Sequence, residues 1–235
     1  MSSSNCRVFV CVAVAFIFSL LFAGAGRAQS TPAAPKPYLP QQWEKEIAAF
    51  EQADKKQFPA PGGIVFVGSS SIRVWKTLAD DFPGVPVLNR GFGGSRIADS
   101  TYFADRIVIP YKPRMIVFYA GDNDLWAGLT PQQVFADYRR FVVTVRRALP
   151  DVHIVYISIK PSPSRWKLRD AMQETNARIR EWGQSIPNHV YADVWTPMLA
   201  SDGQPRPELF LGDQLHMKPE GYAIWKTVIA PLLTP

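Results

Sequence analysis

Short apolar segments and longer amphipathic segments alternate along most of this chain. Apolar runs rich in β-branched and aromatic residues occupy residues 64–67, 85–88, 115–119, 153–157 and 189–194. Amphipathic stretches occupy residues 41–56, 131–149, 164–184 and 219–232. The short runs predict buried strands, and the amphipathic stretches predict helices that pack on them. Together they predict one α/β domain whose parallel sheet is covered on both faces.

The N-terminal segment follows neither pattern. Arg7 precedes an apolar run over residues 8–23, and small residues lead up to Ala28. A basic start, an apolar centre and a small-residue cleavage site are typical of a secretory signal peptide. We therefore predict that residues 1–28 are removed after export to the periplasm or the exterior. A retained anchor is the alternative, but the run is shorter than the roughly 18 residues that a membrane span needs.

Residues 29–40 contain four prolines and no periodicity, which predicts an extended linker before a domain at 41–235. Cys6 and Cys11 both lie in the predicted signal, so the mature chain has no thiol chemistry and no disulfide. The net charge is +6, and the basic residues are scattered rather than clustered. This distribution argues against nucleic-acid binding. No stable membrane insertion is expected after cleavage, and the oligomeric state is not indicated.

Three histidines restrict where acid–base chemistry can lie. His153 and His189 each begin an apolar run, where a strand-edge position is expected. His216 lies in a polar turn before the last predicted helix, with Asp213 three residues upstream. A carboxylate there can bind one imidazole nitrogen and leave the other free as a base. The alternative is a helix-capping turn in which the histidine has no role.

A base of this kind needs a nucleophile, and the mature chain offers only hydroxyl groups or a metal-bound water. Ser70 follows the first apolar run and Gly68, where the chain turns from strand to helix. Unpaired N–H groups at a helix start can stabilise a developing oxyanion. Ser69 and Ser71 are equally suited to cap such a helix, so the position alone does not single out Ser70.

Two further loops follow predicted strands. Residues 89–95 contain three glycines in an order that fits neither the Rossmann nor the Walker A pattern. Residues 121–124, Gly-Asp-Asn-Asp, follow the third apolar run. Because the carboxyl ends of parallel strands meet at one edge of a sheet, we expect both loops to lie beside residues 68–71. Asp122, Asp124 and Asp213 offer an alternative cation site, but the chain has no HExxH motif, and we expect no metal or cofactor.

Taken in order, four segments resemble the motifs of the SGNH or GDSL-type hydrolase family. They are FVGSSS at 66–71, NRGFGG at 89–94, GDND at 121–124 and DQLH at 213–216. The resemblance implies a flavodoxin-like three-layer α/β/α sandwich with a central, mainly parallel five-stranded sheet. The chain departs from the family's usual Gly-Asp-Ser-Leu, because Ser69 stands where the aspartate belongs.

The same resemblance implies the roles of the site residues. Ser70 matches the nucleophile, and Asp213 and His216 match the rest of a catalytic triad. The N–H of Ser70, the N–H of Gly94 and the side-chain amide of Asn123 match the oxyanion hole. Gly93 is an alternative to Gly94 in this role.

The resemblance and the predicted export together imply a secreted serine esterase that needs no cofactor. Short-chain acyl esters are the expected substrates, with acetyl groups on carbohydrate as one candidate. Trp75, Phe92 and Trp126 fall within a few residues of the predicted site and are candidate substrate contacts, with a place in the core as the alternative. Lysophospholipase or thioesterase activity, and non-catalytic carbohydrate binding on the same fold, remain as alternatives.

Overall fold

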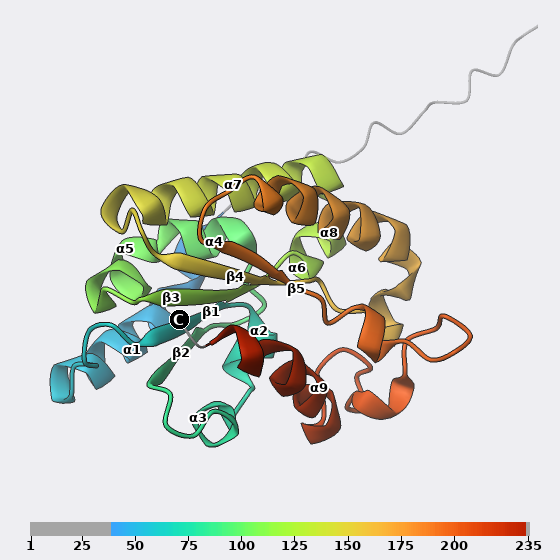
Figure 1. The fold of residues 1–235 in the computed structure, drawn as a ribbon, viewed down its shortest axis with the longest axis horizontal. Helices are drawn as coiled ribbons and strands as arrows, with labels where there is room; N and C mark the ends of the chain where they lie inside the picture. Colours follow the sequence, from blue (N-terminus) through green and yellow to red (C-terminus); the bar gives the residue numbers. More distant parts are fainter. Residues whose placement is uncertain (1–38, 234–235) are drawn as a thin grey trace, which may run out of the picture. The chain divides into compact units, whose positions relative to one another are not determined.

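Five parallel strands form the central sheet, in the spatial order β2-β1-β3-β4-β5 (Figure 1). They are β1 (Ile64–Gly68), β2 (Val87–Gly91), β3 (Met115–Tyr119), β4 (His153–Ile157) and β5 (His189–Ala192). The computed structural model describes residues 39–233, so the predicted signal peptide and all but the last two residues of the predicted linker lie outside the described residues. Within these residues, no helix is long and apolar enough to cross a membrane.

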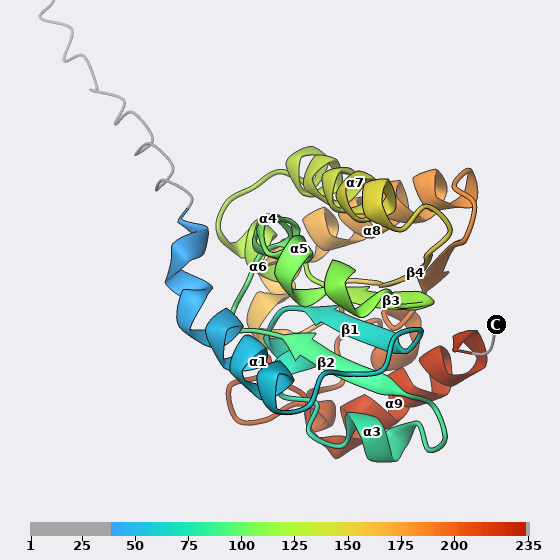
Figure 2. The same ribbon diagram turned by 90° about the vertical axis from the view of Figure 1, so that its left-hand side faces the viewer.

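Helices cover both faces of the sheet (Figures 1 and 2). One face carries α1 (Glu44–Lys56), α4 (Ile97–Tyr102), α5 (Ala104–Ile107), α7 (Pro131–Ala148) and α8 (Arg169–Gln184). The other carries α2 (Ser70–Arg73), α3 (Leu78–Asp81) and α9 (Pro219–Ile229). The predicted flavodoxin-like three-layer sandwich is confirmed, and each pairing between neighbouring strands of this sheet is parallel.

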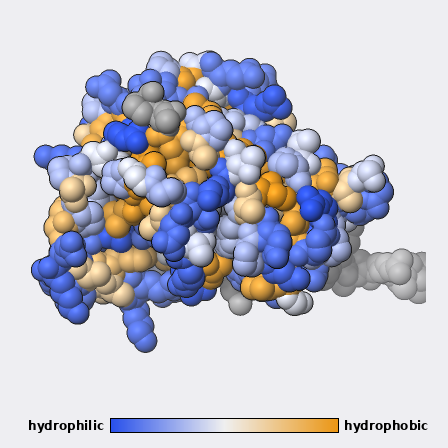
Figure 3. Space-filling model, turned by 60° about the horizontal axis from the view of Figure 1, so that its bottom comes forward, coloured by the Kyte–Doolittle hydropathy of each residue, from blue (hydrophilic) through white to orange (hydrophobic). Residues whose placement is uncertain are grey.

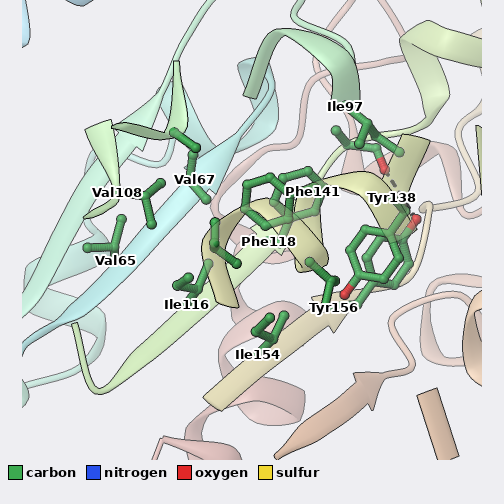
Figure 4. Close-up of a cluster of buried hydrophobic side chains, with 14 of the residues drawn as sticks. Val65, Val67, Ile97, Val108, Ile116, Phe118, Tyr138, Phe141, Ile154 and Tyr156 are labelled. Carbon is green, nitrogen blue, oxygen red and sulfur yellow. Dashed lines mark hydrogen bonds between the residues drawn. The ribbon is translucent and has the colours of Figure 1, made fainter. Parts of the chain in front are cut away.

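The strands supply alternate residues to two separate cores, as the period of two in a strand requires. Figure 4 shows the first core, where Phe118 of β3 meets Phe141 of α7, with ring centroids 4.3 Å apart. In the second core, Phe66 of β1 packs against Trp75 with centroids 5.9 Å apart. Burial on both faces explains why the central strands β1, β3 and β4 are continuous apolar runs in the sequence rather than alternating ones.

Three strands differ in their bounds from the prediction: β1 extends by one residue to Gly68, and β2 and β5 differ more. β2 continues through Asn89 and Arg90, because hydrogen bonds satisfy both polar side chains: Asn89 Nδ2 donates to Ile72 O, and the Arg90 guanidinium donates to Asp54 and Tyr111. β5 ends earlier than predicted, at Ala192. The amphipathic stretch at 164–184 is also divided, into a 3-10 helix, Pro163–Leu168, and α8.

The surface mixes hydrophobic and hydrophilic side chains. Figure 3 shows this on the face that comes forward when the lower side of Figure 1 is turned towards the viewer. The large apolar side chains that are exposed in residues 39–233 come from separate segments: Leu39, Phe58, Tyr102, Trp126, Val143, Val190 and Leu211. Single exposed apolar residues of this kind are normal in folded proteins.

The strand order creates one point where the chain reverses direction across the sheet. From β1 the chain moves outward to β2 on one side, and it returns to place β3 on the other side of β1. Ligands of open α/β sheets bind beyond the carboxyl ends of the strands at such a point. Here those ends are followed by Ser70 after β1 and by Asn123 after β3.

Candidate active site

The turn after β1 places Ser70 at the start of α2. Gly68 ends the strand with a φ of +134°, and a Cβ on it would lie 1.9 Å from Tyr119 O. Only glycine fits there, because other residues are strained at positive φ and the space is filled. The next N–H, that of Ser69, donates to Tyr119 O at 2.9 Å and ties this turn to the end of β3. The turn that presents Ser70 is therefore held on two sides by backbone.

The three consecutive serines have different environments. Ser69 is 1% exposed and Ser71 is 2% exposed, whereas Ser70 is only partly buried. The Ser71 hydroxyl accepts a hydrogen bond from Lys160, and its carbonyl accepts one from Tyr222. Among the three, only Ser70 has its Oγ within hydrogen-bond distance of an imidazole in the described residues. The geometry thus separates Ser70 from its neighbours, which the local sequence does not.

The turn before α9 brings His216 and Asp213 to Ser70. His216 Nε2 lies 3.0 Å from Ser70 Oγ, and His216 Nδ1 lies 2.6 Å from Asp213 Oδ2. Asp213 Oδ1 also accepts the backbone N–H groups of Leu215 and His216, both at 2.9 Å. Burial opposes ionisation of the Asp213 carboxyl, but the bonds from His216 and from the two N–H groups outweigh it and lower its pKa to about 2. At neutral pH this carboxylate only accepts, so Nδ1 carries the proton and Nε2 is free to accept one.

The low pKa of Asp213 predicts a pH-dependent contribution to stability. The ordinary pKa of an aspartate is about 3.9, so the native carboxylate stabilises the fold above about pH 4, and this contribution is lost as the pH falls towards 2. Asp213→Asn is expected to show a smaller fall in unfolding free energy than the wild type over that range. The carboxyl is 48% exposed, so screening limits the difference to about 1 kcal/mol or less.

Urea unfolding at pH 2, 3, 4 and 7 measures this contribution. Asp202→Asn is the matched control, because Asp202 is also exposed but bonds only the nearby Gln204 N–H. Identical pH profiles for Asp213→Asn and the wild type would contradict the assignment.

The two candidate glycines in the loop after β2 have different environments. The Gly93 N–H donates to Glu46 Oε2 at 2.9 Å, and a Cβ on Gly93 would lie 1.9 Å from a ring carbon of Trp43. Gly93 is therefore buried and its N–H is occupied. Gly94 is exposed, and its N–H has no hydrogen-bond partner among residues 39–233, nor does that of Ser70.

The loop after β3 carries Asn123 on the short helix α6 (Asp122–Trp126). Asn123 Nδ2 donates to Ser95 O at 3.2 Å, which directs the amide towards the loop after β2. The same nitrogen lies 3.8 Å from where a Cβ of Gly94 would be. Two predicted donors from different loops are thus neighbours in space.

A buried ammonium connects the loops beneath these groups. The side chain of Lys160 is fully buried. Its Nζ donates to Ser71 Oγ at 3.1 Å, to Tyr119 OH at 3.0 Å and to Asp122 Oδ2 at 3.3 Å. Asp122 in turn accepts the Asn123 N–H at 3.0 Å through its other oxygen. Burial lowers the pKa of Lys160, and the adjacent Asp122 opposes that shift. The network therefore joins the residue after Ser70 to the residue before Asn123.

The three carboxylates considered for a cation site have other partners. Asp122 bonds Lys160, Asp213 bonds His216, and Asp124 accepts the Ile97 N–H at 3.1 Å. Within the described residues, no group of three or more His, Cys, Asp or Glu side chains is placed to hold a metal ion.

The sequence profile of the GDSL-like Lipase/Acylhydrolase family matches residues 65–224. The chain belongs to this family. The match spans the four motifs that suggested the resemblance, from the turn after β1 to the His216 turn. Among curated proteins, none matches the chain significantly.

Solved structures share the GDSL-family fold. A Streptococcus pneumonia protein assigned as a platelet activating factor is 18% identical, with a TM-score of 0.72 over 82% of this chain and 94% of that one. A GDSL-like lipase from Bacteroides thetaiotaomicron is 23% identical, with a TM-score of 0.65 over 83% and 96%. An acetyl-xylooligosaccharide esterase from Geobacillus is 14% identical, with a TM-score of 0.61 over 75% and 96%.

Lys160 is a buried residue next to the proposed site that the sequence patterns missed. It lies beyond the carboxyl end of β4, in Ser158-Ile159-Lys160-Pro161. Only the loops after the first three strands carried recognisable motifs, although all parallel strands end at the same edge. A lysine three residues after a buried strand at that edge is the signal that would have found it.

Four other residues named from the sequence lie outside the proposed site. His153 and His189 are the first residues of β4 and β5, at the edge of the sheet opposite Ser70. Burial lowers the pKa of His189 to about 4. The suggestion that Trp75 and Phe92 contact substrate is corrected. Both residues are at most 1% exposed, and their rings pack in the core. Trp126, by contrast, is 49% exposed.

Proposed function

We propose that this GDSL-family protein is an exported serine esterase that cleaves short-chain acyl esters through an acyl-enzyme. The observation that carries the proposal is the chain of hydrogen bonds from Ser70 Oγ through His216 to Asp213, at 3.0 and 2.6 Å. A nucleophile, a base within reach of it and a group that orients the base are the elements of nucleophilic ester cleavage.

In the first half of the reaction, Ser70 Oγ attacks the ester carbonyl carbon as its proton passes to His216 Nε2. The carbonyl π electrons move onto oxygen and form a tetrahedral oxyanion. Asp213 is ionised at neutral pH and stabilises the imidazolium that results. When the intermediate collapses, the bond to the alcohol oxygen breaks, and His216 returns the proton to the departing alkoxide.

In the second half, water takes the place of the alcohol. His216 removes a proton from water as its oxygen attacks the acyl-enzyme. Collapse of the second intermediate releases the carboxylic acid and returns the proton to Ser70 Oγ. No cofactor takes part in either half of this cycle.

Three donors are proposed to hold the oxyanion: the N–H groups of Ser70 and Gly94 and the side-chain amide of Asn123. Two observations support this set. The Ser70 and Gly94 N–H groups have no partner among residues 39–233, and the Asn123 amide lies beside Gly94. Gly93 is not included because its N–H is already bonded to Glu46. Donors of this kind each contribute about 10²–10³-fold to kcat in other hydrolases.

The proposed substrates are small acyl esters, with acetyl groups on carbohydrate as the favoured candidate. The acetyl-xylooligosaccharide esterase with the same fold supports that choice. The segment at residues 1–28 has the composition of a signal peptide, and export would bring the enzyme into contact with such substrates. Lysophospholipid cleavage would instead require the site to accept long acyl chains, and thioester cleavage would require it to accept a thiolate leaving group.

Hydrolysis of 4-nitrophenyl acetate, butyrate and octanoate tests the proposal. We expect kcat/KM to fall with chain length, and a fluorophosphonate to abolish turnover and label Ser70, as located by peptide mass spectrometry. A higher kcat/KM for octanoate would favour a lipid hydrolase. Absence of turnover on all three esters, with no phosphonate label, would favour a binding protein without catalysis.

A further inference from the structure

Two cationic side chains contact an exposed tryptophan on α6, the helix that carries Asn123. Arg165 Cζ lies 3.7 Å and Lys167 Nζ lies 4.3 Å from the centroid of a Trp126 ring. Such contacts hold cations in place through the ring quadrupole. Arg165 is partly buried, whereas Lys167 and Trp126 are exposed. The cluster therefore presents positive charge in a fixed position.

The cluster is joined to the proposed catalytic loops on two sides. Trp126 lies three residues after Asn123 on α6, which places both on neighbouring positions of one helix face. Next to Arg165 in the chain, the Ser164 N–H donates to Gln214 O at 3.1 Å. Gln214 lies between Asp213 and His216 in sequence. The segments that carry Trp126 and Arg165 are thus connected to the Asn123 helix and to the His216 turn, respectively.

The two cations differ from the neighbouring Arg169 in their ion pairing within the described residues. Neither Arg165 nor Lys167 forms an ion pair among residues 39–233. Arg165 Nε is also buried without a hydrogen-bond partner in this part of the chain. In contrast, the nearby Arg169 pairs with Asp170. Burial lowers the pKa of Arg165. The carboxylate that most opposes this shift is that of Asp122, which already accepts a hydrogen bond from Lys160.

A partly buried guanidinium without a counter-ion gains most from an anionic oxygen ligand. Its planar fork matches a carboxylate or a phosphate, and such charge-assisted hydrogen bonds are about twice as strong as neutral ones. Because the proposed acyl groups are short, a charged group on the substrate would have to belong to the alcohol.

We propose that Arg165 and Lys167 form an anion subsite beside Ser70, and that the preferred substrates are esters whose alcohol carries a carboxylate or phosphate. This inference rests on the proposed esterase function and names the class of its substrate. Trp126 positions the two cations, so its ring is not an open apolar platform for the substrate. Attraction by this cluster also concentrates anionic substrates near the nucleophile.

The test compares three acetyl esters that differ in the charge on the alcohol: 3-acetoxybenzoate, 3-acetoxyphenyl phosphate and the neutral 3-acetoxybenzamide. We expect the wild type to prefer at least one anionic ester over the amide by about 10-fold in kcat/KM, mainly through KM. The preference should shrink as salt rises from about 20 to 500 mM. The better of the two anionic esters identifies the oxyanion that the subsite takes.

The variants are Arg165→Met, Lys167→Met and the control Arg169→Met. Arg165→Met should remove most of the anionic preference. Lys167→Met should lower that preference about 3-fold, and Arg169→Met should leave it unchanged.

An anionic preference that survives in Arg165→Met, or that falls equally in Arg169→Met, overturns the subsite. If the wild type cleaves all three esters equally, the subsite is wrong but the esterase stands. If it cleaves neither these esters nor 4-nitrophenyl acetate, the proposed function itself is wrong.

Discussion

Replacing Ser70 with alanine is expected to lower kcat for 4-nitrophenyl acetate by at least about 10⁴-fold, because the acyl-enzyme can no longer form. The substitution leaves the bond between His216 and Asp213 in place, so the loss would come from the nucleophile alone. Binding and oxyanion stabilisation would account for any rate that remains above that of water.

Ser69→Ala is the matched control. Ser69 is buried at the start of α2, but its side chain makes no capping hydrogen bond, and the contact to Tyr119 comes from its backbone N–H. This variant should keep turnover within a few-fold of the wild type. If Ser69→Ala loses activity and Ser70→Ala retains it, the nucleophile has been assigned to the wrong serine.

Replacing Lys160 with methionine is expected to lower the free energy of unfolding by about 3–5 kcal/mol. The side chain is fully buried, and its removal leaves Asp122 as a buried carboxylate without its cation. Breaking a buried ion pair from one side is strongly destabilising, whereas removing both charges costs much less. Urea unfolding at neutral pH measures the effect.

The charge-balanced variant Lys160→Met with Asp122→Asn separates charge from packing. An asparagine keeps an oxygen that can accept the Asn123 N–H, so the double variant should recover most of the lost stability. If it is no more stable than Lys160→Met alone, the buried charge is not the cause.

In the folded protein, Lys160→Met should lower kcat more than it changes KM. The substitution removes the hydrogen bonds that hold Ser71 and Asp122, which are the chain neighbours of the proposed nucleophile Ser70 and the proposed oxyanion donor Asn123.

The sequence predicted most of the sheet because buried strands leave local signals, and it indicated which loops lie close together. Strands buried on two faces produce apolar runs, and parallel strands end at a common edge, so the pattern of runs alone places Ser70 and Asn123 near each other. The choice of Ser70 among three serines came from the family resemblance. Of the three serines, Ser70 is the one whose Oγ lies next to His216 Nε2. That contact joins residues 146 positions apart in the sequence, so local patterns do not reveal it.

The errors arose where side-chain direction or distant pairing decides the outcome. Phe92 follows β2 and lies two positions before Gly94 in sequence, but its ring points into the core against Phe103. Lys160 looks like a surface residue in the sequence. Its burial depends on Asp122 and Tyr119, which lie 38 and 41 residues away and belong to a different strand and loop.

The contact between Gly93 and α1 sets the shortest fragment that can carry the site. The family profile begins at residue 65, yet the Gly93 N–H is bonded to Glu46 and its Cα lies against the ring of Trp43. A fragment cut at the family boundary would lose both partners and free the loop that presents Gly94. Residues 40–56 thus support the proposed oxyanion loop, and an expression boundary belongs before Pro40 rather than at the first strand.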